Sequence, residues 1–192
     1  MSITYTELYD LVGKKIKPSR FQHSIDVASV CIDLAKRFSL DAEAASIVGI
    51  YHDAYRYVDC SLLFDEIEEA GWEIMPEERE SPMLLHGAVA AMHFDHDAGS
   101  VPLSYKLAVR HHTLGSVRMG ALGAILYIAD YIEPGRKHLS DEDRALILSE
   151  RSLEDMTMRI MDMQRPYFIK EGIKEAGSSL ELYDFLKEGG KL

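Results

Sequence analysis

The stretch IVGIYHDAYRYVD, residues 47–59, places His52 and Asp53 directly after an apolar run. A buried imidazole beside a buried carboxylate is costly unless both groups have partners. The same problem recurs at His23, which shares the apolar face of its predicted helix, and at Asp130, inside the apolar sequence ILYIADYIEP. Any fold of this chain must therefore supply interior partners for several ionisable side chains.

Apolar residues recur at helical spacing along the chain, and no convincing stretch alternates as a β-strand would. We therefore predict an all-α fold, with the whole chain, residues 1–192, forming a single domain. Proline, serine and glycine residues mark the expected helix ends. The expected helices span residues 18–38, 42–57, 61–71, 83–94, 103–113, 119–132, 141–151, 153–169 and 178–190.

Composition limits the partners and the cellular compartment. The net charge of −11 disfavours nucleic acid and anionic membranes as partners, so an anionic substrate needs locally concentrated positive charge. No secretory signal or membrane-spanning stretch is visible, and two cysteines are too few for a disulfide framework. We expect a cytoplasmic protein with reduced thiols that acts on a small molecule.

The His-Asp dipeptide alone carries little information, because about 0.6 such pairs are expected by chance in a chain of this composition. A second pair, His96-Asp97, lies in the polar sequence HFDHDAGS and is expected to form a solvated turn. Only the surroundings of His52 and Asp53 single them out.

One divalent cation would satisfy the interior ionisable groups jointly, because imidazole and carboxylate are ligands that Fe, Mn and Zn accept. Each residue also has an ordinary alternative. A histidine on an apolar face is often a hydrogen-bonded core residue, and Asp130 could pair with Arg136 or Arg144. These alternatives require several helices each to bury a charged group with its own separate partner, so we favour a shared metal.

The ordered set His23, His52-Asp53, His86, His112 and Asp130 resembles the HD-domain superfamily of metal-dependent phosphohydrolases. The sequences RFQHS, GIYHDAYR, LLHGAVAA, VRHHTLG and above all YIADYIEPGR are similar to the YqeK-type family of symmetrical diadenosine tetraphosphate hydrolases. The resemblance implies an HD-type helical bundle with a metal site in its core. The motif region covers about residues 20–136, and C-terminal helices over 140–188 pack on it.

The resemblance also implies the roles of individual residues. Iron is the expected metal, with Mn, Mg, Co or Zn as alternatives and room for a second ion. The implied metal ligands are His23, His52, Asp53 and Asp130. The implied nucleotide-binding residues are Arg20, Arg56, His86, His112, Thr113 and Arg136. Arg56 stands where family members usually carry lysine, and a planar guanidinium contacts phosphate differently from an ammonium.

The implied reaction is hydrolysis of a dinucleoside polyphosphate, with diadenosine tetraphosphate cleaved symmetrically to two ADP by a metal-bound water. Asp53 would orient that water, and His86 and His112 would hold a second cation or donate to the phosphoryl group. Positive charge would come from Arg20, Arg56, Arg110 and Arg136, which we expect to converge on the phosphates.

Three other functions remain open from the sequence. The chain could be another HD phosphohydrolase that acts on mononucleotides or guanosine tetraphosphate. It could be a sensor that binds nucleotide without cleaving it, or an all-α interaction protein without metal. The Met-containing stripe MTMRIMDMQ is expected to be core, although it could pack a homodimer.

Overall fold

The computed structural model describes residues 4–192, and over this range it contains α-helices and two short 3-10 helices but no strand. The all-α prediction is confirmed. The α-helices are α1 (Tyr5–Lys15), α2 (Pro18–Arg37), α3 (Ala42–Tyr51), α4 (Phe64–Glu69), α5 (Pro76–Glu80), α6 (His86–Ala98), α7 (Leu103–His111), α8 (Gly120–Ile132), α9 (Asp141–Ser149), α10 (Leu153–Glu171) and α11 (Gly177–Lys187). The 3-10 helices are η1 (Cys60–Leu62) and η2 (Pro82–Leu85).

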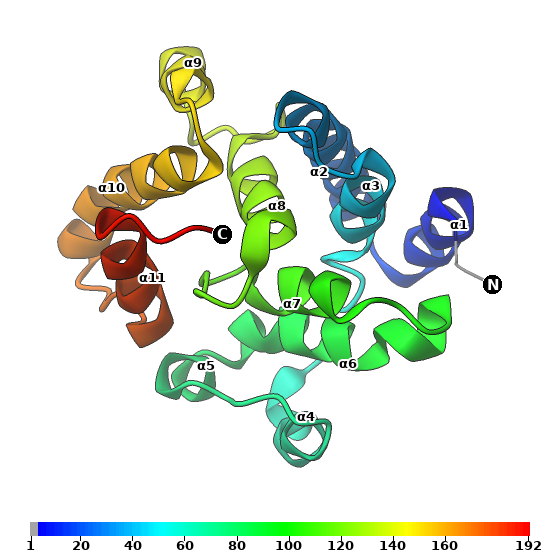
Figure 1. The fold of residues 1–192 in the computed structure, drawn as a ribbon. Helices are drawn as coiled ribbons and strands as arrows, with labels where there is room; N and C mark the ends of the chain where they lie inside the picture. Colours follow the sequence, from blue (N-terminus) through cyan, green and yellow to red (C-terminus); the bar gives the residue numbers. More distant parts are fainter. Residues whose placement is uncertain (1–3) are drawn as a thin grey trace.

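Helix α8 lies at the centre of the fold, with α2 and α3 on one side and α10 with α11 on the other (Figure 1). Its residues from Gly123 to Ala129 are all buried, as expected for a helix that is apolar all round. The polar exception near its end is Asp130. Helix α7 packs on both α6 and α8, so the ends of several helices meet close to this carboxylate.

Helix α3 is shorter than the sequence predicted. It ends at Tyr51 and not at Tyr57, because the backbone N–H groups of Ala54, Arg56 and Val58 each bond to a carbonyl three residues back. The chain thus tightens into turns just where His52 and Asp53 occur. These turns direct two adjacent side chains toward the interior, which a continuing helix would not do.

The prediction of a solvated turn at His96-Asp97 is wrong. Both residues lie inside α6, and only His96 faces solvent, with its side chain 84% exposed. The Asp97 side chain is 5% exposed and accepts hydrogen bonds from Lys15, Tyr51 and Tyr55. Lys15 lies 82 positions away in the sequence, so local polarity could not reveal this partner.

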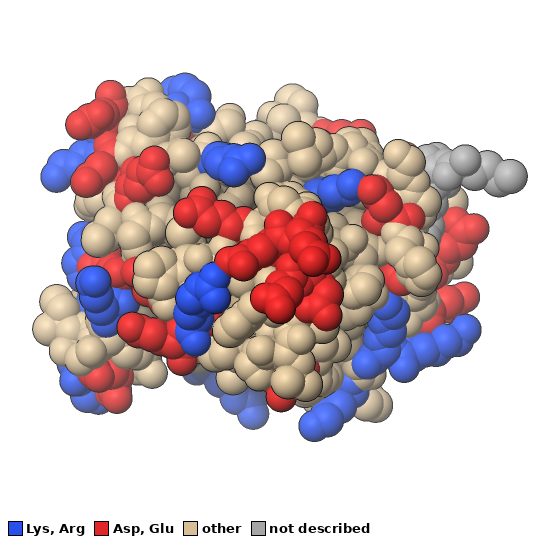
Figure 2. Space-filling model, turned by 90° about the horizontal axis from the view of Figure 1, so that it is seen from below, with Lys and Arg blue, Asp and Glu red and all other residues tan. Residues whose placement is uncertain are grey.

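Acidic side chains gather on the outer face that carries α4 and α5. Figure 2 views the molecule from below Figure 1, where these two helices lie, and shows a broad group of red side chains. Asp65, Glu66, Glu68 and Glu69 of α4 are all exposed. Much of the net negative charge therefore lies on solvated faces.

Over residues 4–192, no helix is both long and apolar enough to cross a bilayer.

Gly49 allows the close approach of α2 and α3, because a Cβ at this position would lie 2.7 Å from the Cα of Ala28. We expect Gly49→Ala to lower the free energy of unfolding by about 1–3 kcal/mol, since backbone cannot move aside as a flexible side chain can. Urea denaturation measures this change. Gly177→Ala is the matched control, because a Cβ there meets nothing within 4 Å. Equal stability of the two variants would contradict the close-packing explanation.

Candidate metal centre

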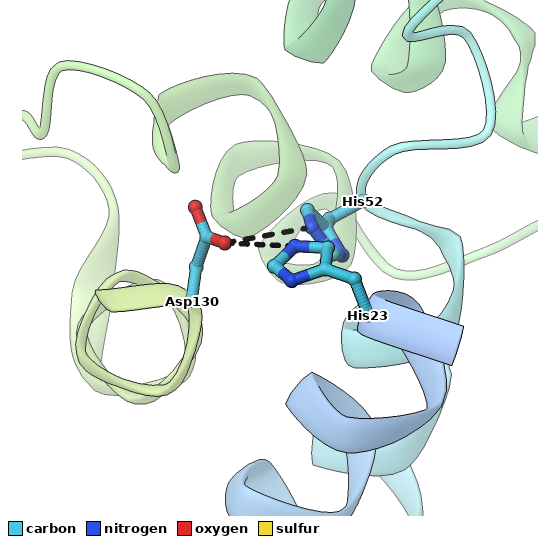
Figure 3. A group of neighbouring side chains, drawn as sticks. All are labelled: His23, His52 and Asp130. Carbon is cyan, nitrogen blue, oxygen red and sulfur yellow. Dashed lines mark ion pairs between the residues drawn. The ribbon is translucent and has the colours of Figure 1, made fainter. Parts of the chain in front are cut away.

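Side chains from three regions meet at one buried point beside α8. His23 comes from α2, His52 from the end of α3 and Asp130 from α8 (Figure 3). Asp53 follows His52 in the turn after α3. Asp130 Oδ1 lies 3.0 Å from His23 Nε2 and 4.0 Å from His52 Nε2. Asp53 Oδ2 lies 3.7 Å and 3.3 Å from the same two nitrogens. The structure thus brings together all four residues that the sequence predicted as ligands.

The hydrogen bonds of the outer ring nitrogens orient the two histidines. His52 Nδ1 lies 2.7 Å from the carbonyl oxygen of Gly49, and His23 Nδ1 lies 3.0 Å from Glu133 Oε1. Both partners accept hydrogen bonds, so a proton on Nδ1 of each neutral ring leaves the Nε2 lone pair facing the centre. This arrangement is typical of metal-binding histidines. In His23, however, Nε2 also lies 3.0 Å from an acceptor, Asp130 Oδ1.

His86 and His112 extend the cluster on the side of α6 and α7. Their Nδ1 atoms lie 2.7 Å from the carbonyl oxygens of Met83 and Val109, and their Nε2 atoms lie 3.0 Å apart. His86 Nε2 is also 3.0 Å from Asp53 Oδ1. Two lone pairs cannot face each other at this distance without a proton or cation beside them.

Gly87 makes the pairing of these two imidazoles sterically allowed. A Cβ at this position would lie 2.6 Å from the carbonyl oxygen of Val109 and 3.0 Å from His112 Nδ1. The neighbour that Gly87 admits is the end of α7.

The buried polar atoms of the centre lack hydrogen bonds within the chain. His23 Nε2, His52 Nε2 and both carboxylate oxygens of Asp53 are unpartnered in this sense, although the Asp53 side chain is fully buried. Burying such groups without hydrogen bonds is strongly unfavourable. The charge of Arg20 offsets part of this cost at Asp53, and a divalent cation would satisfy all four atoms at once. Mixed imidazole and carboxylate donors fit a first-row transition metal.

The pKa shifts show how strongly these groups interact. Burial raises the pKa of Asp53, but the neighbouring His52 and His86 outweigh burial and hold it well below its usual range. Burial lowers the pKa of His52, but the charge of Asp53 outweighs burial and the net shift is upward. Burial, together with His86 and His52, lowers the pKa of His112 to about 3. His112 is therefore neutral at physiological pH.

Predicted phosphate-binding side chains surround the centre. Arg20 pairs with Asp53, and Arg136 donates from Nε to the carbonyl of Asp130 at 2.6 Å and pairs with its carboxylate. Thr113 donates to the carbonyl of Leu84 at 3.3 Å. Arg56 Nη1 lies 3.1 Å from His86 Nδ1.

Arg110 does not converge with the other arginines, and this prediction is wrong. Its guanidinium donates to both carboxylate oxygens of Glu78, at 2.6 and 2.8 Å, and to the carbonyl of Glu73. Both side chains of this ion pair are buried. Arg110 therefore anchors the segment around α5 to α7 and is not available to a ligand.

Two cavities open beside the centre. The smaller, of about 210 Å³, is polar and is bordered by Asp130, His112 and Arg136. The larger, of about 820 Å³, is bordered by Arg56 and by apolar residues of α10. Both cavities share the side chains Thr113, Tyr127 and Gln164.

Several residues at the centre were not predicted from the sequence. Glu133 contacts His23, His138 borders the smaller cavity, and Tyr127 donates to Gln164 at 3.1 Å between the two cavities. Glu133 follows Asp130 by one helical turn in YIADYIEPGR, which is the signal that could have revealed it. Gln164 lies in a helix remote in sequence, and nothing near it distinguishes it from a surface residue.

The helical fold and the buried cluster of imidazoles and carboxylates define a protein of the HD domain family. The model of this family matches residues 20–135, and the chain belongs to it. The family is metal-dependent, in agreement with the groups of histidines and aspartates that could hold a metal here.

Proteins similar to this chain along most of its length carry more specific names. A protein of Staphylococcus aureus named bis(5'-nucleosyl)-tetraphosphatase, symmetrical, is 26% identical over 91% of this chain and 90% of its own. A Bacillus subtilis protein of the same name is 30% identical over 82% of this chain and 88% of its own. A crystal structure of a predicted HD superfamily hydrolase involved in NAD metabolism from Clostridium acetobutylicum superimposes with a TM-score of 0.87. It is 25% identical and covers 98% of this chain and 100% of its own.

Removing one carboxylate should weaken metal binding. We expect Asp130→Asn to lower the affinity for a divalent cation by about tenfold or more, because a neutral amide replaces a charged donor. Calorimetric titration of the metal-free protein with Mn²⁺ measures this change. His96→Ala is the control, since that side chain is exposed and remote from the cluster. Equal affinities of the wild type and Asp130→Asn would exclude Asp130 as a ligand.

Proposed function

We propose that this chain is a metal-dependent hydrolase of dinucleoside polyphosphates, and that it cleaves diadenosine tetraphosphate symmetrically to two molecules of ADP. The observation that carries the proposal is a buried cation-binding cluster bordered by a small polar cavity, which shares Thr113, Tyr127 and Gln164 with a second cavity of nucleotide size. The names of the similar S. aureus and B. subtilis proteins supply the substrate.

The proposed ligands are His23, His52, Asp53 and Asp130, with iron as the metal. A cation bound there would lower the pKa of a coordinated water molecule and would polarise a phosphoryl oxygen. Asp53 has two buried oxygens that face the cluster from different sides, so it can also orient water for attack on a phosphorus atom. This second role makes it the proposed catalytic carboxylate.

His86 and His112 provide a place for a proton beside the cluster. Since both Nδ1 protons are directed to carbonyls, a further proton on His86 Nε2 lies within hydrogen-bonding distance of Asp53 and His112. The pair can therefore hold a proton that is given to a phosphate oxygen of the leaving nucleotide. His112 has its pKa lowered to about 3 and thus accepts that hydrogen bond as a neutral ring.

Four further residues are proposed to bind the substrate phosphates. Arg20 and Arg136 present planar guanidinium groups next to Asp53 and Asp130, and planar donors suit bidentate contact with phosphate. Thr113 borders both cavities, and Arg56 borders the larger. These groups give the local positive charge that a chain of net charge −11 needs in order to bind a polyphosphate.

The larger cavity is the proposed nucleoside site. A volume of about 820 Å³ lies within the usual range for small-molecule pockets, about 300–1,000 Å³. Leu114, Met161, Phe168 and Ile173 give it apolar walls that suit a base. Three of these side chains come from α10 and the segment after it, so we propose that the C-terminal helices act with residues 20–136 as one domain.

Two free cysteines, Cys31 and Cys60, both buried, support a proposed site of action in the reducing cytoplasm.

The test of substrate is a product assay with diadenosine tetraphosphate and a divalent metal, analysed by anion-exchange chromatography. We expect ADP as the sole product, and we expect Asp53→Asn to reduce turnover by at least about 10²-fold, because it removes both a ligand and the proposed orienting group. Turnover of mononucleotides or guanosine tetraphosphate alone would contradict the proposal. Binding of nucleotide without turnover would contradict it in favour of a sensor.

The role of Arg136 is tested by kinetics. We expect Arg136→Ala to raise KM about tenfold or more, because a charged hydrogen bond to phosphate is worth about 1.5–3 kcal/mol. Arg79→Ala is the matched control, since Arg79 pairs with Glu68 on the surface and both are about half exposed. An unchanged KM in Arg136→Ala would remove this residue from the phosphate site.

A further inference from the structure

Glu133 is a buried carboxylate to which the proposed reaction gives no role. It caps the C-terminus of α8, one turn beyond Asp130, and its residue surface is 2% exposed. Burial of a carboxylate is costly unless its oxygens receive hydrogen bonds. The Glu133 carboxylate therefore needs hydrogen-bond donors in the protein interior.

Both oxygens of Glu133 are used, each by a different donor. Oε1 lies 3.0 Å from His23 Nδ1, and Oε2 accepts from the backbone N–H of Gly135. Arg136 Nε lies 3.7 Å from Oε1. The absence of a side chain at Gly135 leaves room for this contact, because a Cβ there would lie 2.9 Å from Oε2. One carboxylate thus links a proposed ligand to the turn that carries Arg136.

The backbone N–H of Gly135 is a donor to Glu133, and His23 Nδ1 is a second donor when that nitrogen carries the ring proton. A carboxylate can accept from both, whereas the amide of glutamine offers one acceptor and one NH₂ group. Glutamine at this position must turn its NH₂ group either toward Gly135 N–H or toward His23 Nδ1. No orientation of an amide reproduces the observed pair of hydrogen bonds.

The proton of a neutral His23 ring has two competing destinations. With Nδ1 protonated, the ring donates to Glu133, and Nε2 presents a lone pair to the cluster. With Nε2 protonated, the ring would donate to Asp130 Oδ1, which lies 3.0 Å away. In that second tautomer the hydrogen bond occupies both His23 Nε2 and Asp130, and neither is free to bind a cation through those atoms.

We propose that Glu133 is a positioning residue for metal binding, because it holds His23 in the tautomer whose Nε2 faces the cluster. The inference rests on the proposed function only in that it assumes a cation at this cluster. It assumes no particular substrate. Outer partners of metal-binding histidines fix the ring and its tautomer, and their removal typically costs 10–100-fold in metal affinity.

The first test is calorimetric titration of the metal-free full chain with Mn²⁺. We expect Glu133→Gln to weaken Mn²⁺ binding about 10–100-fold relative to the wild type. Glu78→Gln is the matched control, because Glu78 is also buried, and it receives hydrogen bonds from Arg110 and from the backbone N–H of Met75 away from the cluster. The Glu78→Gln variant should have a lower melting temperature than the wild type and the same affinity for Mn²⁺. Equal weakening in both variants would assign Glu133 a merely structural role and overturn the proposal.

The second test reads the tautomer directly, without metal or substrate. Two-bond ¹H–¹⁵N correlation spectra of the metal-free protein distinguish the protonated from the unprotonated nitrogen of the His23 ring. We expect a proton on Nδ1 in the wild type and on Nε2 in Glu133→Gln. If Glu133→Gln does not fold, Glu133→Asp poses the same question, because it keeps the charge but withdraws the carboxylate by one methylene.

An Nδ1 proton in both the wild type and the variant would overturn the proposal, and so would wild-type Mn²⁺ affinity in the variant. Neither readout involves turnover, so a failure here is distinct from a failure of the proposed hydrolase activity. Loss of ADP formation with a normal Mn²⁺ affinity would instead count against the proposed function.

Discussion

The fold depends on how the fully buried carboxylate of Asp53 is accommodated. Its two oxygens make no hydrogen bond within the chain, yet they lie among the imidazoles of His52 and His86 and the guanidinium of Arg20. Such a group is stable only if positive charge surrounds it. The positive charge comes from the start of α2, which carries Arg20, and from the end of α3, which carries His52. Helix α8 completes the cluster with Asp130. The helices are arranged around this electrostatic requirement as much as around their apolar faces.

Hydrogen bonds outside the cluster orient its imidazole rings. The four imidazoles of His23, His52, His86 and His112 each direct Nδ1 to a fixed acceptor, so their Nε2 atoms converge. Three of these acceptors are backbone carbonyls of the same local turn, three residues earlier in the chain. His23 is different, because its acceptor is a side chain from another helix. The geometry of this one ligand therefore depends on tertiary packing between α2 and the end of α8.

Much of this arrangement could be predicted from sequence, because helical spacing shows which face a residue occupies. It placed His23 and Asp130 toward the interior and gave α8, α10 and their caps close to their observed ends. Spacing does not identify partners distant in the chain. It therefore missed the hydrogen bond that Lys15 donates to Asp97, and the ion pair with Glu78 that withdraws Arg110. The early end of α3 was missed because turns bonded three residues back have the same local composition as helix.

Anomalous X-ray diffraction at the absorption edge of the bound metal shows whether His23, His52, Asp53 and Asp130 share one cation. We expect an anomalous peak enclosed by these four side chains, about 2.0–2.2 Å from His23 Nε2 and His52 Nε2. Crystals grown with the metal that show no peak there, and instead show His23 and Asp130 bonded directly to each other, would contradict it.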